Sequence, residues 1–154
     1  MDLDIQATFT NRDSNFWDEE VVEFFVAPKD LKRYFELQWN PLGGVFDAII
    51  QNDLDEKGVS TAFHGDWTYT AKGMSSAVKV KGTVNDSSDK DQYWQVEVRL
   101  PFADLREEAP KPGTVWRANF YRMDYDDGKK TSWDWARVGT SFHEFKKFGT
   151  LVFE

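Results

Sequence analysis

The sequence predicts one all-β domain over residues 1–154, built as an antiparallel β-sandwich. Apolar and polar residues alternate with a period of two in several segments, and turn-forming residues separate these segments at short intervals. No window of ~12 residues carries a helical apolar stripe. A chain of 154 residues can bury about 68–70% of its unfolded surface, so it needs no disulfides to fold, and it has no cysteine.

Nine strands are predicted along the chain. They cover residues 3–10, 20–26, 33–39, 44–50, 67–71, 77–84, 93–100, 114–123 and 148–153, with the clearest alternation in RYFELQW, AVKVKGTV and YWQVEVRL. Turns are predicted at NPLGG (40–44), NDLDEKG (52–58), NDSSDKD (85–91), KPG (111–113) and DYDDGKK (124–130). PFADLREE (101–108) is expected to form at most a short turn of helix that begins at its proline.

Charge and composition exclude several classes of protein. The net charge is −8 and the longest basic runs are pairs, so no nucleic acid is expected as a partner. No apolar run approaches the ~20 residues of a membrane span, and the acidic first residues are unlike a signal peptide. The absence of cysteine excludes a thiol nucleophile and a zinc–thiolate site.

Catalytic and metal-binding patterns are weak. His64 and His143 lie far apart without ligand spacing, so each is expected to have a structural or hydrogen-bonding role. No Gly-x-Ser-x-Gly motif is present, and no pair stands out among the 27 acidic residues as a glycosidase dyad, so an enzyme is the less favoured interpretation. The acidic turns NDLDE and DYDDG offer oxygen ligands but do not match the spacing of a calcium loop. No cofactor is therefore predicted, and calcium stays open.

The segment FWDEEVVEFF is the least ordinary part of the chain. Trp17 precedes three consecutive acids, and Glu23 interrupts an apolar strand. Alternation sends Val22 and Phe24 into the sandwich and Glu23 to the other face. Glu23 is therefore not expected to be a buried charge, and its face is predicted to be a concave surface with Trp17 at the rim.

Motifs along the whole chain carry a resemblance to a known family. FWDEEVVEFFVAP opens the series, YFELQWNPLGGVFD, WQVEVRLPFADL and WRANFYRMD follow in order, and FHEFKKFGTLVFE closes it. Together they resemble carbohydrate-binding module family 9 and its family 9-like relatives. The resemblance implies a β-sandwich of jelly-roll type that binds sugars without catalysis and is often attached to xylanases and other glycoside hydrolases that act on plant polysaccharides. It also implies an extracellular or cell-surface location.

The resemblance implies roles for five residues. Trp17 matches the first of two tryptophans that clamp a sugar ring in sugar-binding members, and Phe142 stands where the second is expected. Glu23 matches a glutamate that accepts hydrogen bonds from sugar hydroxyls. Glu36 aligns with an arginine of these members, and Tyr121 aligns with a polar residue, so the sugar specificity of the family does not carry over intact.

The chemistry of sugars agrees with this assignment. A sugar presents apolar C–H faces and hydroxyl edges, so its site needs aromatic rings together with carboxylates and amides. Phe142 is followed by His143, a polar side chain that is expected to form hydrogen bonds with sugar hydroxyls. Trp133 and Trp135 place two indoles on one side of a loop with Asp134 opposite. Two interpretations of that pair stand, a second part of the ligand site and a loop packed over the end of the sandwich.

The predicted function is non-catalytic recognition of a plant-type oligosaccharide or polysaccharide by an aromatic clamp. Two alternatives remain, a structural or interaction domain whose sugar site has decayed, and an accessory domain of a glycoside hydrolase with chemistry of its own. The resemblance begins in the middle of an edge strand, so a few of the family's first strands are expected to be missing or supplied from elsewhere. An open edge favours pairing, so a homo-oligomer or a parent enzyme chain is a further expected partner.

Overall fold

The structure is a computed structural model that describes residues 4–126 and 128–154. Within these ranges the regular elements are strands and short 3-10 helices. The strands are β1 (Val21–Ala27), β2 (Arg33–Trp39), β3 (Val45–Leu54), β4 (Ser60–Asp66), β5 (Ser75–Lys81), β6 (Tyr93–Arg99), β7 (Val115–Asp126), β8 (Lys129–Asp134) and β9 (Gly149–Val152). The 3-10 helices are η1 (Phe16–Asp18), η2 (Phe102–Leu105) and η3 (Phe145–Lys147). The all-β prediction is confirmed.

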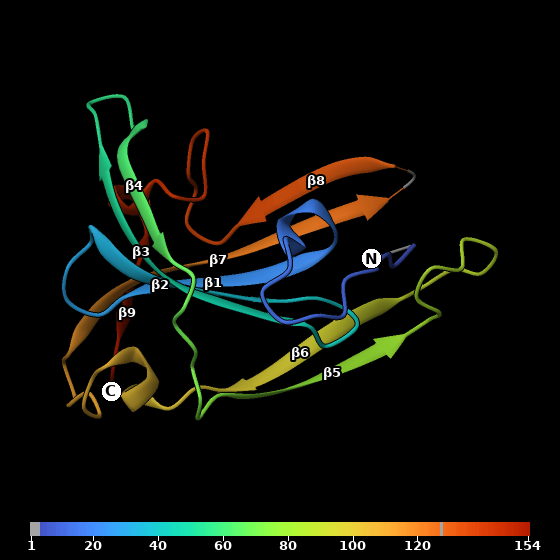
Figure 1. The fold of residues 1–154 in the computed structure, drawn as a ribbon, viewed down its shortest axis with the longest axis horizontal. Helices are drawn as coiled ribbons and strands as arrows, with labels where there is room; N and C mark the ends of the chain where they lie inside the picture. Colours follow the sequence, from blue (N-terminus) through green and yellow to red (C-terminus); the bar gives the residue numbers. More distant parts are fainter. Residues whose placement is uncertain (1–3, 127) are drawn as a thin grey trace.

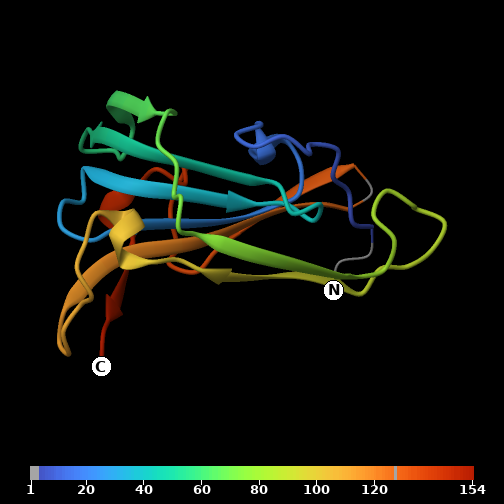
Figure 2. The ribbon, with the colours of Figure 1, turned by 60° about the horizontal axis from the view of Figure 1, so that its bottom comes forward.

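The strands form two antiparallel sheets in a sandwich-like arrangement, as predicted. The large sheet has the order β4-β3-β2-β1-β7-β8, and β9 pairs with β7 beside it. The second sheet is the β5–β6 hairpin. Figures 1 and 2 show this hairpin against one face of the large sheet, while the short helix η1 lies on the other side. The large sheet is therefore covered differently on its two faces.

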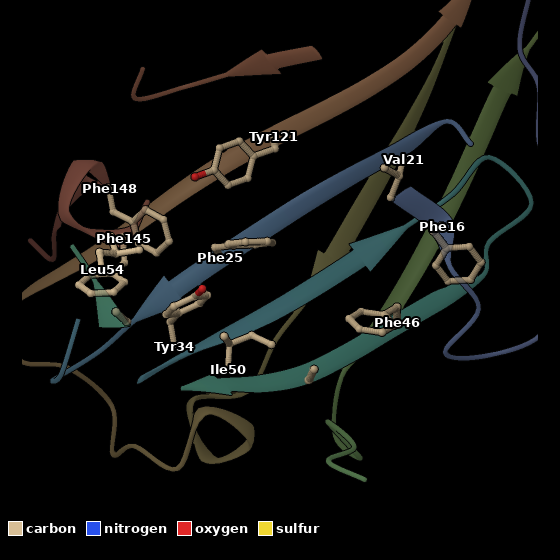
Figure 3. Close-up of a cluster of buried hydrophobic side chains, with 12 residues drawn as sticks. Phe16, Val21, Phe25, Tyr34, Phe46, Ile50, Leu54, Tyr121, Phe145 and Phe148 are labelled. Carbon is tan, nitrogen blue, oxygen red and sulfur yellow. The ribbon is translucent and has the colours of Figure 1, made fainter. Parts of the chain in front are cut away.

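Each face of the large sheet has its own buried cluster. Phe25, Tyr34 and Tyr121 project from β1, β2 and β7 on the face that also holds η1 and η3 (Figure 3). Val26 and Phe35 project to the opposite face, where the segment around η2 packs. Burying one such aromatic or aliphatic side chain contributes roughly 1.5–3 kcal/mol. The central strands are consequently apolar on both faces, with a few polar exceptions that mark the site described below.

Residues 3–10, predicted as a strand, are not part of a sheet over their described residues 4–10. The backbone amides of this segment bond to side chains of other segments instead of to a neighbouring strand. The pairs are Ile5 with Asp91, Gln6 with Glu20, Ala7 with Asn85 and Thr8 with Glu19, at 2.6–2.9 Å. The alternating pattern predicted an extended backbone correctly, but it could not show that side chains would take the place of a ladder.

The two outer strands of the large sheet were not predicted, and residues 67–71 were wrongly predicted as a strand. Strands β4 and β8 are largely exposed edge strands, so they lack the apolar alternation that marks a half-buried strand. Trp67 and Tyr69 alternate because they pack from a loop onto Phe46 and Phe35. No helix in the described part of the chain is long and apolar enough to cross a membrane.

Candidate functional site

A pocket of about 540 Å³ opens on the face of the large sheet that lies opposite the hairpin. Its floor comes from β1 and β2, and its walls come from η1, the β4 region, β8 and the loop 138–143. Five residues singled out from the sequence meet in it: Trp17, Glu23, Glu36, Phe142 and His143. They come from segments that are far apart in the chain, so the fold itself assembles this group.

The floor of the pocket is polar and buried. Glu23, Glu36 and Gln38 are 2%, 4% and 0% exposed, so the expectation that Glu23 is not a buried group is wrong. Glu23 lies directly opposite Gln38 in the β1–β2 ladder, and Gln38 Nε2 donates to Glu36 Oε1 at 2.6 Å. Alternation predicted the face of these side chains correctly. The burial arises because walls from four other segments rise around that face.

Three acceptor atoms on this floor have no hydrogen-bond partner among the described residues. They are Glu23 Oε1, Glu36 Oε2 and Gln38 Oε1. A buried polar atom without a partner costs about 1–3 kcal/mol, and native structures leave few of them. A ligand that donates hydrogen bonds would remove this cost, so these atoms mark the floor as a binding surface.

Burial also changes the acidity of the two glutamates. It raises the pKa of Glu36 from 4.5 to about 8, although the hydrogen bond from Gln38 opposes the change. Burial and then the Glu36 carboxylate raise the pKa of Glu23, while Lys130 lowers it. The two carboxyl groups therefore hold less than two negative charges near neutral pH.

Two aromatic residues that the sequence did not single out stand in the pocket wall. Phe63 on β4 and Trp67 just after it are 44% and 50% exposed. Trp17 and Trp67 both pack against Phe46, with ring centroids at 5.5 and 5.7 Å. The indole of Trp67 lies over Gly65, where a Cβ would come within 2.3 Å of the ring. The glycine therefore makes room for the tryptophan.

Phe142 is held at the opposite wall by Tyr121. The two rings stack with centroids 4.0 Å apart and planes 10° apart, and the Tyr121 hydroxyl donates to the Phe142 carbonyl at 2.8 Å. Tyr121 is 2% exposed and does not line the pocket. The structure does not support the predicted contact of Tyr121 with sugar hydroxyls, because its hydroxyl already donates to the Phe142 carbonyl and its ring packs behind Phe142.

His143 is at the pocket wall but bonds inward. Its Nδ1 lies 2.8 Å from the Tyr34 hydroxyl, and its ring packs on Phe25 and Phe63 at centroid distances of 5.2 and 4.9 Å. Burial lowers the pKa of His143 to about 4, so the ring is neutral near neutral pH. His64 is exposed on β4 and is not among the lining residues.

The loop that carries Phe142 and His143 is tied together by Glu144. One carboxylate oxygen of Glu144 accepts hydrogen bonds from the amides of Gly139, Thr140 and Ser141, and the other pairs with Lys147 at 2.6 Å. Glu144 is only 2% exposed. The loop's position against the pocket thus rests on one buried and fully bonded carboxylate.

Trp133 and Trp135 lie outside the pocket. Both are about half exposed, and they project away from Asp134, which does line the pocket. The prediction placed both indoles on a loop, but Trp133 belongs to strand β8. Trp135 packs at 5.8 Å against Phe120. The structure therefore does not bring these two tryptophans together with the other predicted site residues.

No group of three His, Asp or Glu side chains that could hold a metal occurs among residues 4–126 and 128–154. The DYDDG turn includes position 127, which lies outside the described residues. The calcium expectation therefore stays a prediction for that turn.

The fold and the pocket define an all-β binding module with an aromatic-walled, polar-floored pocket. The chain belongs to carbohydrate-binding family 9, whose family model matches residues 1–153. This is a family of non-catalytic binding domains. No curated protein matches the chain.

A crystal structure supports the fold independently. It is that of a candidate carbohydrate-binding protein from Bacteroides uniformis ATCC 8492, which is 21% identical to this chain. The two superpose with a TM-score of 0.69, and the match covers 97% of this chain and 68% of the other.

Proposed function

We propose that the pocket binds a saccharide, and that the protein is a non-catalytic carbohydrate-binding module. The observation that carries the proposal is the set of three unpartnered acceptor atoms on a floor enclosed by aromatic rings. Hydroxyl groups of a sugar would donate to Glu23, Glu36 and Gln38, while its C–H faces would rest on the rings. Membership of carbohydrate-binding family 9 supports the same ligand class.

The proposed contacts divide between walls and floor. Trp17 and Phe142 would stack on the sugar ring from opposite walls, and Trp67 would extend the stacking surface toward the rim. A pocket of about 540 Å³ is within the ~300–1,000 Å³ range of small-molecule sites, so it suits one or two sugar units at a chain end or branch.

The biological setting is also a proposal. We expect a plant-type oligosaccharide or polysaccharide as the ligand, an extracellular or cell-surface location, and an attached or partner enzyme that degrades the polysaccharide. These expectations rest on the resemblance to family 9. In this setting the module would hold the enzyme near its substrate, and its own contribution would be binding alone.

Isothermal titration calorimetry with a panel of sugars tests the proposal. The panel contains glucose, glucosamine, cellobiose, xylobiose and longer glucans, and the proposal expects saturable binding of at least one of them. Trp17→Ala should weaken that binding by about tenfold or more, because it removes a stacking face. Trp133→Ala is the matched control, since this half-exposed tryptophan lies outside the pocket and its loss should leave affinity unchanged.

Three outcomes would contradict the proposal. If no sugar of the panel binds at millimolar concentration, the proposed binding function is wrong, and a structural or interaction domain with a decayed site is favoured. Equal losses in Trp17→Ala and Trp133→Ala would show that the pocket is not where the sugar binds. Activity on a chromogenic glycoside that disappears with one carboxylate would favour the glycosidase alternative.

A further inference from the structure

The chemistry of the pocket floor narrows the class of sugar, and this inference rests on the proposed function. The three unpartnered atoms on the floor are all acceptors if both glutamates are ionised. Glu23 and Gln38 are directly cross-strand, a geometry that places Cβ atoms about 4.5–5.5 Å apart, and Gln38 is bonded to Glu36. A single small donor group can therefore reach all three side chains.

The charges that face the pocket are mainly negative. Its titratable lining residues are Glu23 on β1, Glu36 on β2, Lys130 and Asp134 on β8, and His143 in the loop. His143 is neutral because burial lowers its pKa to about 4. The pair Glu23 and Glu36 retains a proton near neutral pH, so a cation is favoured where it takes the place of that proton between the two side chains. The net charge of −8 for the whole chain acts in the same direction.

We infer that the pocket selects a cationic amino sugar, a hexosamine whose ammonium group donates to Glu23, Glu36 and Gln38 while its ring stacks on the aromatic walls.

An ammonium fits this floor better than a hydroxyl does. It brings three donors and no acceptor, whereas a hydroxyl brings one donor and lone pairs that would face other acceptors. Its charge stabilises the carboxylates of Glu23 and Glu36, which are otherwise costly to ionise in a buried site. The surrounding rings favour a cation further through their electron-rich faces.

Lys130 opposes such a ligand, and this makes it a useful probe. Its ammonium donates to the Trp17 carbonyl at 3.2 Å at the rim of the pocket, and the residue is exposed. It lowers the pKa of Glu23, as a cation close to a carboxyl group does. Removing this charge should therefore strengthen binding of a cationic sugar relative to that of a neutral sugar.

The experiment is a calorimetric comparison of D-glucosamine with D-glucose and N-acetyl-D-glucosamine at pH 7. We expect glucosamine to bind about tenfold more tightly than either neutral sugar, because charge-assisted hydrogen bonds are roughly twice as strong as neutral ones. The preference should shrink at pH 5, because the bound ammonium takes the place of a proton on the Glu23–Glu36 pair and that proton is harder to displace at lower pH. Cyclohexylamine, a ring that carries an ammonium but no hydroxyls, serves as the non-sugar probe.

Variants separate charge from shape. Glu36→Gln keeps the size of the side chain and removes its charge, so it should reduce the preference for glucosamine to about twofold or less. Lys130→Gln should raise glucosamine affinity about threefold, while Lys129→Gln, an equal change of net charge at a residue that does not line the pocket, should not. Thermal melting of each variant confirms that it is folded.

The outcomes distinguish this inference from the proposed function. If glucose and N-acetylglucosamine bind as tightly as glucosamine, the amino-sugar inference is overturned and the proposed sugar site stands. If no sugar binds, both are overturned. If cyclohexylamine equals glucosamine, the pocket recognises charge alone and the inference is overturned. Unchanged preference in both Glu36→Gln and Lys130→Gln would likewise overturn it.

Discussion

Glu20 and Glu23 lie three positions apart at the start of β1, and both are buried, but their surroundings differ. Glu20 accepts hydrogen bonds from the Gln6 amide at 2.8 Å and from the Trp94 indole at 3.0 Å, with Arg122 at 3.6 Å. Glu23 Oε1 has no partner in the described part of the chain. The comparison teaches that burial of a charge does not identify a site. An unpartnered atom that also lines a pocket does, whereas Trp39, Asp47 and Asn52 each have a buried atom that is unpartnered among the described residues but lies outside the pocket lining.

The direction of each side chain explains the difference. Strand alternation sends Glu20 to the side of the hairpin, where Trp94 of β6 meets it, and sends Glu23 into the pocket. Glu20 links the large sheet to the hairpin through its bond with Trp94. Glu23 instead presents an unpartnered acceptor to a ligand in the pocket.

The largest expected effect is the difference in stability between two single variants, Glu20→Gln and Glu23→Gln. Glu20→Gln should lower the free energy of unfolding by about 3 kcal/mol, because the amide oxygen cannot replace both carboxylate oxygens that accept from Gln6 and Trp94, and because the charge attraction to Arg122 is lost. Glu23→Gln should change stability by less than about 1 kcal/mol, since it breaks no bond within the protein. Urea unfolding measures both. Equal losses at the two positions would break the comparison.

A smaller effect should appear as a dependence of stability on pH. The pKa of Glu36 is raised from 4.5 to about 8, so the folded protein keeps a proton that the unfolded chain releases, and stability falls as pH rises toward 8. The pKa of His143 is lowered from 6.5 to about 4, which makes stability rise with pH below 6.5. The window from pH 6.5 to 8 therefore reports on the pocket carboxyls alone.

Across that window the free energy of unfolding should fall by about 2 kcal/mol. Urea titrations at several pH values measure it. Glu36→Gln should lose most of the fall, whereas Glu20→Gln should keep it. A flat profile in the parent protein would mean that the pocket carboxyls have ordinary acidity.

The smallest expected effect sharpens the comparison at Glu144. This buried glutamate is fully bonded, as Glu20 is, but it supports the pocket loop. Glu144→Gln should cost about 1–2 kcal/mol of stability and weaken sugar binding about threefold, because Phe142 loses part of its support. Denaturation and calorimetry on the same preparation measure both. A binding loss without a stability loss would contradict a purely positioning role.

Much of the fold could be predicted because most strands bury one face and therefore alternate. Strand β6 was found this way. Strand β2 is buried on both faces but still alternates, because one of them carries the polar floor residues Glu36 and Gln38. Strands β4 and β8 were missed because an exposed edge strand needs no apolar face. Gln38 could have been found, since alternation places it on the same face as Glu36. Phe63 and Trp67 could not, because only the tertiary pairing of β4 with β3 brings them to the pocket.

Most of the site residues that the family resemblance implied line the pocket, but one does not, and the difference has a physical reason. Glu23 reaches the pocket because strand register fixes its face, whereas Trp17 and Phe142 are brought there by η1 and the loop 138–143. Tyr121 lies on the predicted face, but its ring stacks on Phe142 and its hydroxyl donates to the Phe142 carbonyl. No pattern in the sequence predicts this contact. Contacts between two aromatic rings depend on rotamers that periodicity does not encode.

The segment 4–10 has a consequence for how this sequence can vary. Its backbone amides are held by the side chains of four distant residues, which are Glu19, Glu20, Asn85 and Asp91. A strand in a ladder is specified by its neighbour's backbone, which every residue except proline possesses. In the segment 4–10 the backbone is instead positioned by side-chain acceptors from elsewhere in the chain. Substitutions at the exposed positions Thr8 and Thr10 should be tolerated, while the buried Ile5 and Ala7 and the acceptors that hold the backbone should not be replaceable without loss of stability.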